Sequence, residues 1–224
     1  MIVKGVIFDF NGTMFYDNDI QENSWRTFLH RKTGRNITDN EFHEYVHGRN
    51  AENSLQYFLG RKLSSDEMEQ LAEEKEILYR ALCMQDKSRF KLMDGLTEFL
   101  DMLRKDKTSF TIATASGFNN VTFFFRHLAL DKWFDIEKVI YDDGTLPGKP
   151  QPDMYQKAAW TIGVLPENCV VFEDTKAGVL AAERAGIGKI VGVAKMISQS
   201  QLKGMAGLCH IIPNFYNAYS IIYE

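Results

Sequence analysis

The order of apolar and polar residues divides the chain into three stretches. Residues 3–8 form a short run of apolar and β-branched side chains, which is typical of a buried strand. Residues 15–88 have the spacing of helices and contain no convincing strand. From residue 94 onward, short apolar runs alternate with helical patterns. We therefore expect an α/β core that is interrupted after its first strand by a helical insert.

The alternating stretch predicts a parallel sheet. Its expected strands are residues 109–116, 136–143, 168–175 and 189–194, and its expected helices are residues 94–105, 119–130, 152–163 and 176–186. Strands that alternate with helices form right-handed crossovers, which place helices on both faces of the sheet. The predicted fold is a Rossmann-like core of residues 1–14 and 89–224, with an inserted helical domain of residues 15–88.

The helical insert has two recognisable helix starts. Thr38 is followed three residues later by Glu41, and Ser64 is followed by Glu67 at the same spacing. This is the capping-box pattern, in which each of the two side chains bonds the backbone N–H of the other residue. Further along, Lys75 falls inside an apolar stripe, so its ammonium group must snorkel to the surface or face a polar cleft.

Composition and charge exclude several classes of protein. The 224 residues suffice for a large core, and a net charge of −4 argues against a nucleic-acid-binding protein. No apolar run approaches the ~20 residues of a membrane span. Acidic Asp9 interrupts the apolar N-terminal run, which disfavours a signal peptide. The three cysteines, Cys83, Cys169 and Cys209, are scattered along the chain, and their number is odd. They fit reduced thiols, so we expect a cytoplasmic protein.

Polar side chains stand at the ends of four of the predicted strands or in the loop that follows. They are Asp9 and Asn11, Thr114 and Ser116, Lys149, and Glu173 and Asp174. Ligands of open parallel α/β sheets bind outside the carboxyl ends of the strands, so we expect these side chains at one edge of the sheet. Each alone is also explained as strand capping, but the four together indicate a site.

The chemistry that suits these residues is phosphoryl transfer. A carboxylate such as Asp9 can accept a phosphoryl group. Asp9 and Asp174 can hold Mg²⁺, which prefers oxygen ligands and offsets the repulsion between two anions. Thr114 and the backbone N–H groups that follow it can bind phosphate oxygens. Lys149 adds a positive charge beside the transferring group.

The motifs DFNGT, TAS, GKPQPD and FEDTKAG resemble those of the haloacid dehalogenase superfamily, and more closely those of its β-phosphoglucomutase-like phosphatases. The resemblance covers nearly the whole chain, since the helical insert stands where that group has a small α-helical cap. It implies that Asp9 is the nucleophile and that Thr114 and Lys149 hold the phosphoryl group. The implied ligands of Mg²⁺ are the Asp9 and Asp174 carboxylates and the Asn11 backbone carbonyl, with Glu173 nearby.

Asn11 departs from the pattern of this family, whose phosphatases and mutases have an aspartate there. That aspartate protonates the leaving oxygen and then activates water or a second hydroxyl, whereas an amide cannot transfer a proton. General acid–base help is worth ~10²–10⁴-fold, so ordinary phosphate esters should react slowly. The alternatives are a slow phosphatase, an enzyme for good leaving groups such as acyl phosphates, and a non-catalytic binding protein. A hexose-phosphate mutase is disfavoured, because it needs a proton shuttle.

Four residues are candidates for contact with the rest of the substrate, namely Gln21, Arg49, Lys75 and Ser116. By the resemblance, Lys75 stands where caps of the family place a lysine near the substrate, and Gln21 replaces a common histidine. Arg49 is either an anion contact or a solvated side chain at a helix end. Ser116 either faces the leaving group or caps a helix. The expected partner is a small phosphorylated metabolite, bound by a monomer or a small homo-oligomer.

A competing motif, HEYVH at residues 43–47, matches the zinc-protease pattern H-E-x-x-H. It can place two histidines on one helical face with Glu44 as the base, and Glu67 is an available third ligand. Because no other zinc-protease feature supports the motif, we interpret these histidines as surface residues of a cap helix.

Overall fold

The computed structural model describes residues 3–46, 51–194 and 202–224. The chain forms two compact units, a core unit of residues 1–16 and 91–224 and a helical unit of residues 17–90. From the sequence we expect the junctions two residues earlier, after residues 14 and 88.

The core unit is built on a six-stranded sheet in which every neighbouring pair is parallel. The strand order is β3-β2-β1-β4-β5-β6. The strands are β1 (Gly5–Phe8), β2 (Ser109–Gly117), β3 (Ile140–Asp142), β4 (Cys169–Glu173), β5 (Lys189–Val193) and β6 (Leu208–Ile212). The predicted parallel α/β sheet is confirmed, and β1 lies between β2 and β4, so the residues after these three strands share one edge.

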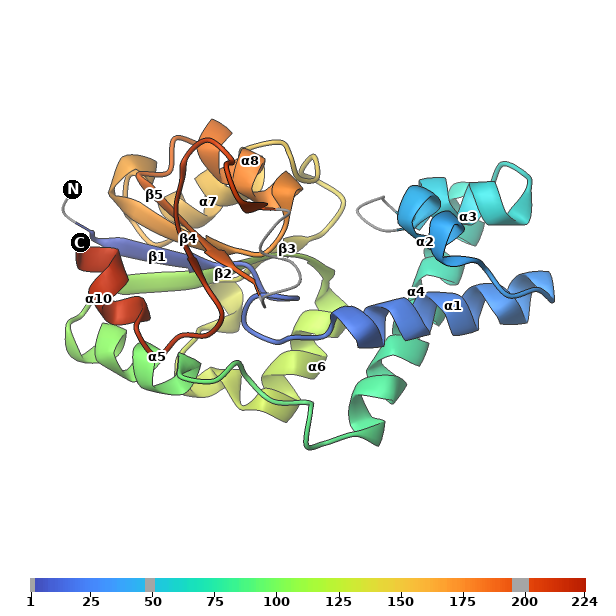
Figure 1. Cartoon of the computed structure of the whole chain (residues 1–224), viewed down its shortest axis with the longest axis horizontal. Helices are drawn as coiled ribbons and strands as arrows, with labels where there is room; N and C mark the ends of the chain where they lie inside the picture. Colours follow the sequence, from blue (N-terminus) through green and yellow to red (C-terminus); the bar gives the residue numbers. More distant parts are fainter. Residues whose placement is uncertain (1–2, 47–50, 195–201) are drawn as a thin grey trace. The chain divides into compact units, whose positions relative to one another are not determined.

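Helices cover both faces of this sheet, as Figure 1 shows. They are α5 (Leu96–Lys105), α6 (Phe118–Leu128), α7 (Asp153–Thr161), α8 (Lys176–Arg184) and α10 (Ala218–Tyr223). Short 3₁₀ turns lie at Leu130–Lys132, Ile136–Lys138 and Pro166–Asn168. α7 and α8 lie on one face, and α5, α6 and α10 lie on the other.

Successive side chains of β1 contribute to the apolar cores on the two faces of the sheet. The Ile7 side chain packs with apolar residues of α7 and α8, whereas Phe8, the next residue, packs among aromatic rings on the opposite face. The Phe8 ring stacks on Phe172 with a centroid separation of 5.4 Å and meets Phe99 edge-on at 6.0 Å. Successive side chains of a strand point to opposite faces, so a four-residue strand buried on both sides is apolar throughout.

Three details of the core differ from the sequence prediction. β3 is shorter than expected, because Ile136–Lys138 forms a 3₁₀ turn that the Asp135 side chain caps through Glu137 N–H. α6 ends at Leu128, two residues early, since Ala129 adopts a left-handed backbone with φ of 52°. β6 is missing from the prediction, because this edge strand is only partly buried and has a weak apolar pattern.

The helical unit contains α1 (Asn18–Thr33), α2 (Asp39–Tyr45), α3 (Ala51–Leu59) and α4 (Ser65–Gln85). Its predicted all-helical character is confirmed, and so are both capping boxes, because Thr38 and Ser64 each accept a hydrogen bond from the predicted glutamate N–H and receive its side chain in return. An apolar cluster made largely of Phe28, Leu29, Phe42, Val46, Leu55 and Phe58 holds these helices together. Among the described residues, no helix has both the length and the apolar character that crossing a bilayer requires.

Candidate active site

Asp9 leaves the end of β1 in a fixed direction. Its backbone N–H donates to the Phe172 carbonyl at 3.0 Å, which continues the pairing between β1 and β4 by one residue. The chain then turns sharply, with Met14 N–H donating to the Phe10 carbonyl at 2.8 Å. The Asp9 side chain is nearly buried, and rigid backbone on both sides of it restricts where the carboxylate can point.

Gly12 allows this turn to pass close to Asp174. Its φ is +78°, a left-handed conformation that favours glycine. A Cβ atom at Gly12 would lie 2.0 Å from Asp174 Oδ2, so any side chain there would displace the carboxylate. The neighbouring Thr13 hydroxyl donates to Asp174 Oδ1 at 3.4 Å. The DFNGT motif, which follows β1, therefore helps to position the carboxylate of Asp174, which follows β4.

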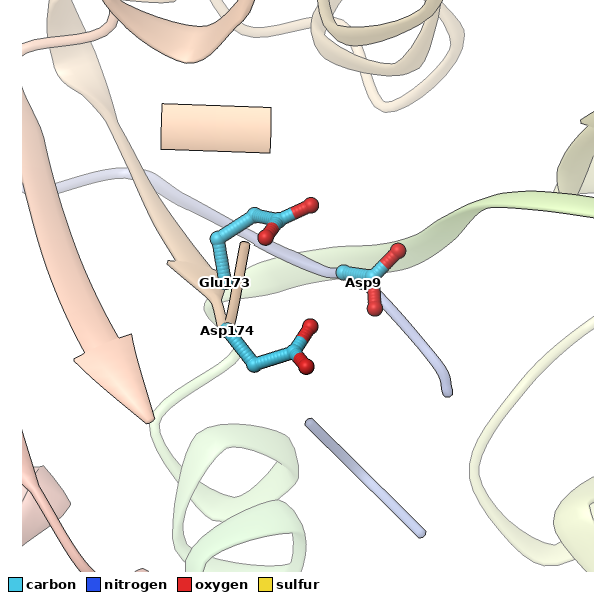
Figure 2. Close-up of side chains that lie close together, drawn as sticks. All are labelled: Asp9, Glu173 and Asp174. Atoms are coloured by element: carbon cyan, nitrogen blue, oxygen red, sulfur yellow. The ribbon is translucent and has the colours of Figure 1, made fainter. Parts of the chain in front are cut away.

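Three carboxylates meet where β1 and β4 end side by side. Asp9, Glu173 and Asp174 each offer an oxygen, and these oxygens lie within 4.8 Å of one another. In Figure 2 the Glu173 and Asp174 carboxylates point toward the side on which Asp9 lies. Hard oxygen donors at this spacing suit Mg²⁺, so the residues present fit the metal that the sequence predicts.

Lys149 reaches this group from the loop between β3 and α7. Its Nζ atom lies 2.6 Å from Asp9 Oδ1 and 2.7 Å from Glu173 Oε1, and its side chain is almost fully buried. Because Asp9 and Lys149 are 140 residues apart in the sequence, only the fold brings them together. The role of Lys149 beside the nucleophile stays a prediction.

Both oxygens of Glu173 already accept hydrogen bonds from protein groups. Oε1 accepts from Lys149 and from the Tyr155 hydroxyl at 3.2 Å, and Oε2 accepts from the Thr175 N–H at 2.6 Å and the Thr175 hydroxyl at 3.0 Å. A Cβ atom at Gly178 would overlap this carboxylate at 1.7 Å, so glycine makes room for it. Glu173 is thus better suited to hold Lys149 than to bind a metal directly.

Sequence reasoning missed Tyr155. It lies on α7, and its side chain is fully buried beside the Lys149–Glu173 pair. The signal that could have found it is a tyrosine on the buried face of a helix, since a buried phenolic hydroxyl usually needs a polar partner.

Burial controls the charge states of this group. Burial raises the pKa of Asp9 to about 7; Lys149 opposes this effect and Glu173 adds to it. For Lys149, burial alone would lower the pKa, but the Asp9 and Glu173 carboxylates outweigh it and hold the pKa well above its usual value. Lys149 therefore stays cationic, and a bound divalent cation would favour the ionised, nucleophilic form of Asp9.

Asn11 and Ser116 meet at the ends of β1 and β2. The Ser116 hydroxyl donates to Asn11 Oδ1 at 2.8 Å, and the Ser116 N–H donates to the Thr114 hydroxyl oxygen at 3.1 Å. The structure thus brings Asp9, Asn11, Thr114 and Ser116 to one edge of the sheet, as predicted from the parallel strands. Thr114 is buried, and its predicted contact with phosphate stays a prediction.

The other candidate residues lie in the helical unit. Lys75 is buried, and its Nζ donates to Gln21 Oε1 at 2.6 Å and to Glu76 Oε1 at 2.9 Å. The ammonium also lies 5.1 Å from the centre of the Trp25 ring. Lys75 thus has polar and aromatic partners inside the helical unit. Arg49 lies outside the described residues, and contact of Gln21, Arg49 and Lys75 with a substrate stays a prediction.

The zinc-protease motif gains no support. α2 ends at Tyr45, and His47 lies outside the described residues. Within the described parts of the chain, the only group of three or more potential metal ligands is Asp9, Glu173 and Asp174, which contains no histidine.

The chain thus belongs to the class of open parallel α/β proteins, whose ligands bind at the carboxyl ends of the strands, and here that edge carries an acidic group and a lysine. Comparison with known proteins identifies the family within this class. The model of the haloacid dehalogenase-like hydrolases matches residues 3–186.

Individual relatives agree with this match. A phosphorylated carbohydrates phosphatase from Thermotoga maritima is 26% identical, over 94% of this chain and 94% of its own length. A β-phosphoglucomutase from Bacillus subtilis is 29% identical, over 83% of this chain and 81% of its own. Among solved structures, a haloacid dehalogenase hydrolase of family IA, variant 3, from Entamoeba histolytica is 36% identical with a TM-score of 0.88, covering 96% of this chain and 94% of its own.

The chain belongs to the haloacid dehalogenase-like hydrolases, in the subgroup that contains β-phosphoglucomutases and related phosphatases. It is therefore an enzyme of hydrolase type, and the resemblance drawn from its four motifs is confirmed.

Proposed function

We propose that this enzyme hydrolyses the phosphate monoester of a small sugar-like metabolite through a phosphoryl group carried by Asp9. The observation that carries the proposal is the position of Lys149 Nζ, 2.6 Å from Asp9 Oδ1, with Asp174 completing an acidic group beside them. The names of the relatives support the substrate class, since the Thermotoga protein is a phosphatase of phosphorylated carbohydrates.

In the proposed first step, an Asp9 oxygen forms a bond to phosphorus while the bond from phosphorus to the ester oxygen breaks. Lys149 stabilises the negative charge of the transferring group, and the Thr114 hydroxyl and nearby N–H groups bind its oxygens. In the second step, water attacks the phosphorus while the bond from phosphorus to the Asp9 oxygen breaks, which regenerates Asp9 and releases inorganic phosphate. Since Asn11 cannot carry protons, the proton lost by the water and the proton gained by the leaving alcohol in the first step are exchanged with solvent. The Asp9 and Asp174 carboxylates and the Asn11 carbonyl would hold Mg²⁺, which supplies positive charge against the repulsion between carboxylate and phosphate.

Asn11 limits this reaction at the leaving group. Its side chain can donate a hydrogen bond to the departing oxygen, but it has no proton to transfer. We therefore propose slow hydrolysis of alkyl phosphates and faster hydrolysis of esters whose alcohols leave readily. The same feature disfavours a mutase, which must move protons between two hydroxyl groups of a sugar.

The helical unit is the proposed source of substrate selection, through Lys75, Gln21 and Arg49. Cap segments can exclude water and select substrates by size when they close. We also retain the sequence-based expectation of a cytoplasmic enzyme that works as a monomer or a small homo-oligomer.

A panel of phosphorylated metabolites, with p-nitrophenyl phosphate as a reactive reference, tests this function. We expect phosphate release with Mg²⁺, none with excess EDTA, and none from Asp9→Asn. Asp131→Asn, which changes an exposed acid of the core unit, is the matched control and should retain activity. Binding of a phosphorylated metabolite without any release of phosphate would contradict the proposal and favour a non-catalytic role.

A further inference from the structure

One buried tyrosine contacts both members of the ion pair beside Asp9. The Tyr155 hydroxyl lies 3.2 Å from Glu173 Oε1, and the Lys149 Nζ lies 5.0 Å from the centre of the Tyr155 ring. The hydroxyl thus donates to Glu173, and the ring lies against the Lys149 ammonium group. Contacts between a cation and an aromatic face are stronger when water is excluded, and the side chains of Tyr155 and Glu173 are almost completely buried here.

Glu173 is fixed at both ends of its carboxylate. Thr175 supplies two donors to Oε2, at 2.6 and 3.0 Å, and Tyr155 supplies a neutral donor to Oε1. Lys149 donates to that same Oε1 at 2.7 Å. The tyrosine hydroxyl and the lysine ammonium therefore share one oxygen of Glu173.

The hydroxyl is not explained by packing. A phenylalanine would fill the same buried space without a polar atom, and burying a hydroxyl is costly unless it is bonded. The hydroxyl donates to Glu173, in a group that also contains Asp9 and Lys149. The hydroxyl therefore satisfies part of the hydrogen-bonding capacity of Glu173 Oε1, while Lys149 stays bonded to both Glu173 and Asp9.

We propose that Tyr155 is a positioning residue: its hydroxyl and ring hold Glu173 and Lys149 so that the lysine ammonium stays against Asp9. The expected effect on turnover rests on the proposed function, whereas the expected effect on the Lys149 ammonium group does not.

The test compares Tyr155→Phe with Tyr79→Phe. Tyr79 is a matched control, because it is equally buried and its hydroxyl donates to the Asp17 carboxylate at 2.5 Å, within the helical unit. Three readouts are used: the ¹H–¹⁵N signal of the Lys149 ammonium in lysine-labelled protein, assigned with Lys149→Arg; the melting temperature; and, for Tyr155→Phe, kcat and KM for p-nitrophenyl phosphate with Mg²⁺.

We expect Tyr155→Phe to shift or broaden the Lys149 signal and to lower kcat about tenfold, while KM changes less than about twofold. Tyr79→Phe should lower the melting temperature but leave the Lys149 signal unchanged. A Tyr155→Phe protein with a lowered melting temperature, an unchanged Lys149 signal and an unchanged kcat would overturn the proposal and leave Tyr155 a purely structural role.

Two further outcomes remain decisive. If the wild-type protein releases phosphate from no ester, the proposed function fails, but the Lys149 signal still tests the positioning role. If Tyr155→Phe does not fold, 3-fluorotyrosine placed at position 155 keeps the ring and makes the hydroxyl a stronger donor. 3-Fluorotyrosine at position 155 must shift the Lys149 signal, and 3-fluorotyrosine at position 79 must not. If neither replacement shifts the Lys149 signal, the proposal is refuted.

Discussion

The Ser116 hydroxyl donates a 2.8 Å hydrogen bond to the side-chain oxygen of Asn11. Asn11 occupies the position at which the resemblance places an acid and base, and the bond to Ser116 holds its side chain at the edge of the sheet where Asp9 emerges. An aspartate has nearly the same shape as an asparagine and could accept the same hydrogen bond. Asn11→Asp would therefore add a group that can transfer a proton while nearly keeping the shape of the side chain and its hydrogen bond to Ser116.

Asn11→Asp should raise the hydrolysis of simple alkyl phosphates, on the order of 10²-fold or more, because it supplies a proton donor for a poor leaving group. Hydrolysis of p-nitrophenyl phosphate should gain less, since its leaving group needs less protonation. Steady-state rates with Mg²⁺ measure both effects. No gain on any ester, with fold and Mg²⁺ binding intact, would show that the missing acid does not limit this protein.

Asp174→Asn should weaken Mg²⁺ binding at least tenfold, because it removes a charged oxygen ligand from the group around Asp9. Glu173→Gln should weaken it far less, since both Glu173 oxygens already accept hydrogen bonds from Lys149, Tyr155 and Thr175. Calorimetric titration of each protein with Mg²⁺ gives the comparison. Equal losses in the two variants would instead make Glu173 a ligand of the metal.

Gly12→Ala should destabilise the core unit and abolish Mg²⁺ binding, since its Cβ would lie 2.0 Å from Asp174 Oδ2. Gly163→Ala is the matched control in the same unit, because Gly163 also has a positive φ, +70°, but has open space around the site of a Cβ atom. The control should lose only about 1–2 kcal/mol for the left-handed backbone and keep its metal affinity. Urea unfolding and Mg²⁺ titration separate the two variants, and similar behaviour of both would refute the role of Gly12.

Thiol reactivity should be confined to Cys209 in the folded protein. Burial raises the pKa values of Cys83 and Cys169 to about 12, whereas Cys209 is exposed. Iodoacetamide at pH 8 should label one cysteine in the native protein and three after unfolding, as mass spectrometry would show. Labelling of Cys83 or Cys169 in the native protein would contradict this burial.

The two buried thiols also predict a pH dependence of stability. Their ordinary pKa of 9.0 applies to the unfolded chain, and the folded pKa is higher, so folding is disfavoured once the unfolded thiols ionise. Their contribution is fully present below pH 9 and is lost as the pH rises from 9 toward 12. Replacing both by alanine should flatten the part of the urea-stability profile that lies above pH 9.

Lys75→Ala should lower the melting temperature of the protein and also raise KM or lower kcat for the natural substrate. A lysine that faces a polar cleft would lose almost no stability on truncation, but the ammonium donates to Gln21 at 2.6 Å and to Glu76 at 2.9 Å, and it faces the Trp25 ring. Removing the ammonium takes one hydrogen-bond partner from each of these two half-buried side chains. Lys75→Met, which keeps the length, separates the two effects: an unchanged KM and kcat in that variant would limit Lys75 to a structural role.

The sequence by itself determined the fold class and most of the residues at the strand ends. Apolar runs that alternate with helical patterns specify a parallel sheet, and in such a sheet Asp9, Thr114 and Asp174 must lie in the last residues of strands, or just after them, along one edge. Both capping boxes were also predictable, because their hydrogen bonds join residues three positions apart. These features depend on local spacing, which a sequence displays directly.

Only the tertiary structure decided which side chains hold one another. Lys149 meets Asp9 across 140 positions of sequence, and Thr13 meets Asp174 across 161. The edge strand β6 was missed because its weak apolar pattern becomes meaningful only beside β5. Likewise, nothing near Tyr155 in the sequence shows that its hydroxyl faces Glu173, because the direction of a buried side chain is set by the packing of α7 on the sheet and not by its neighbours in the chain.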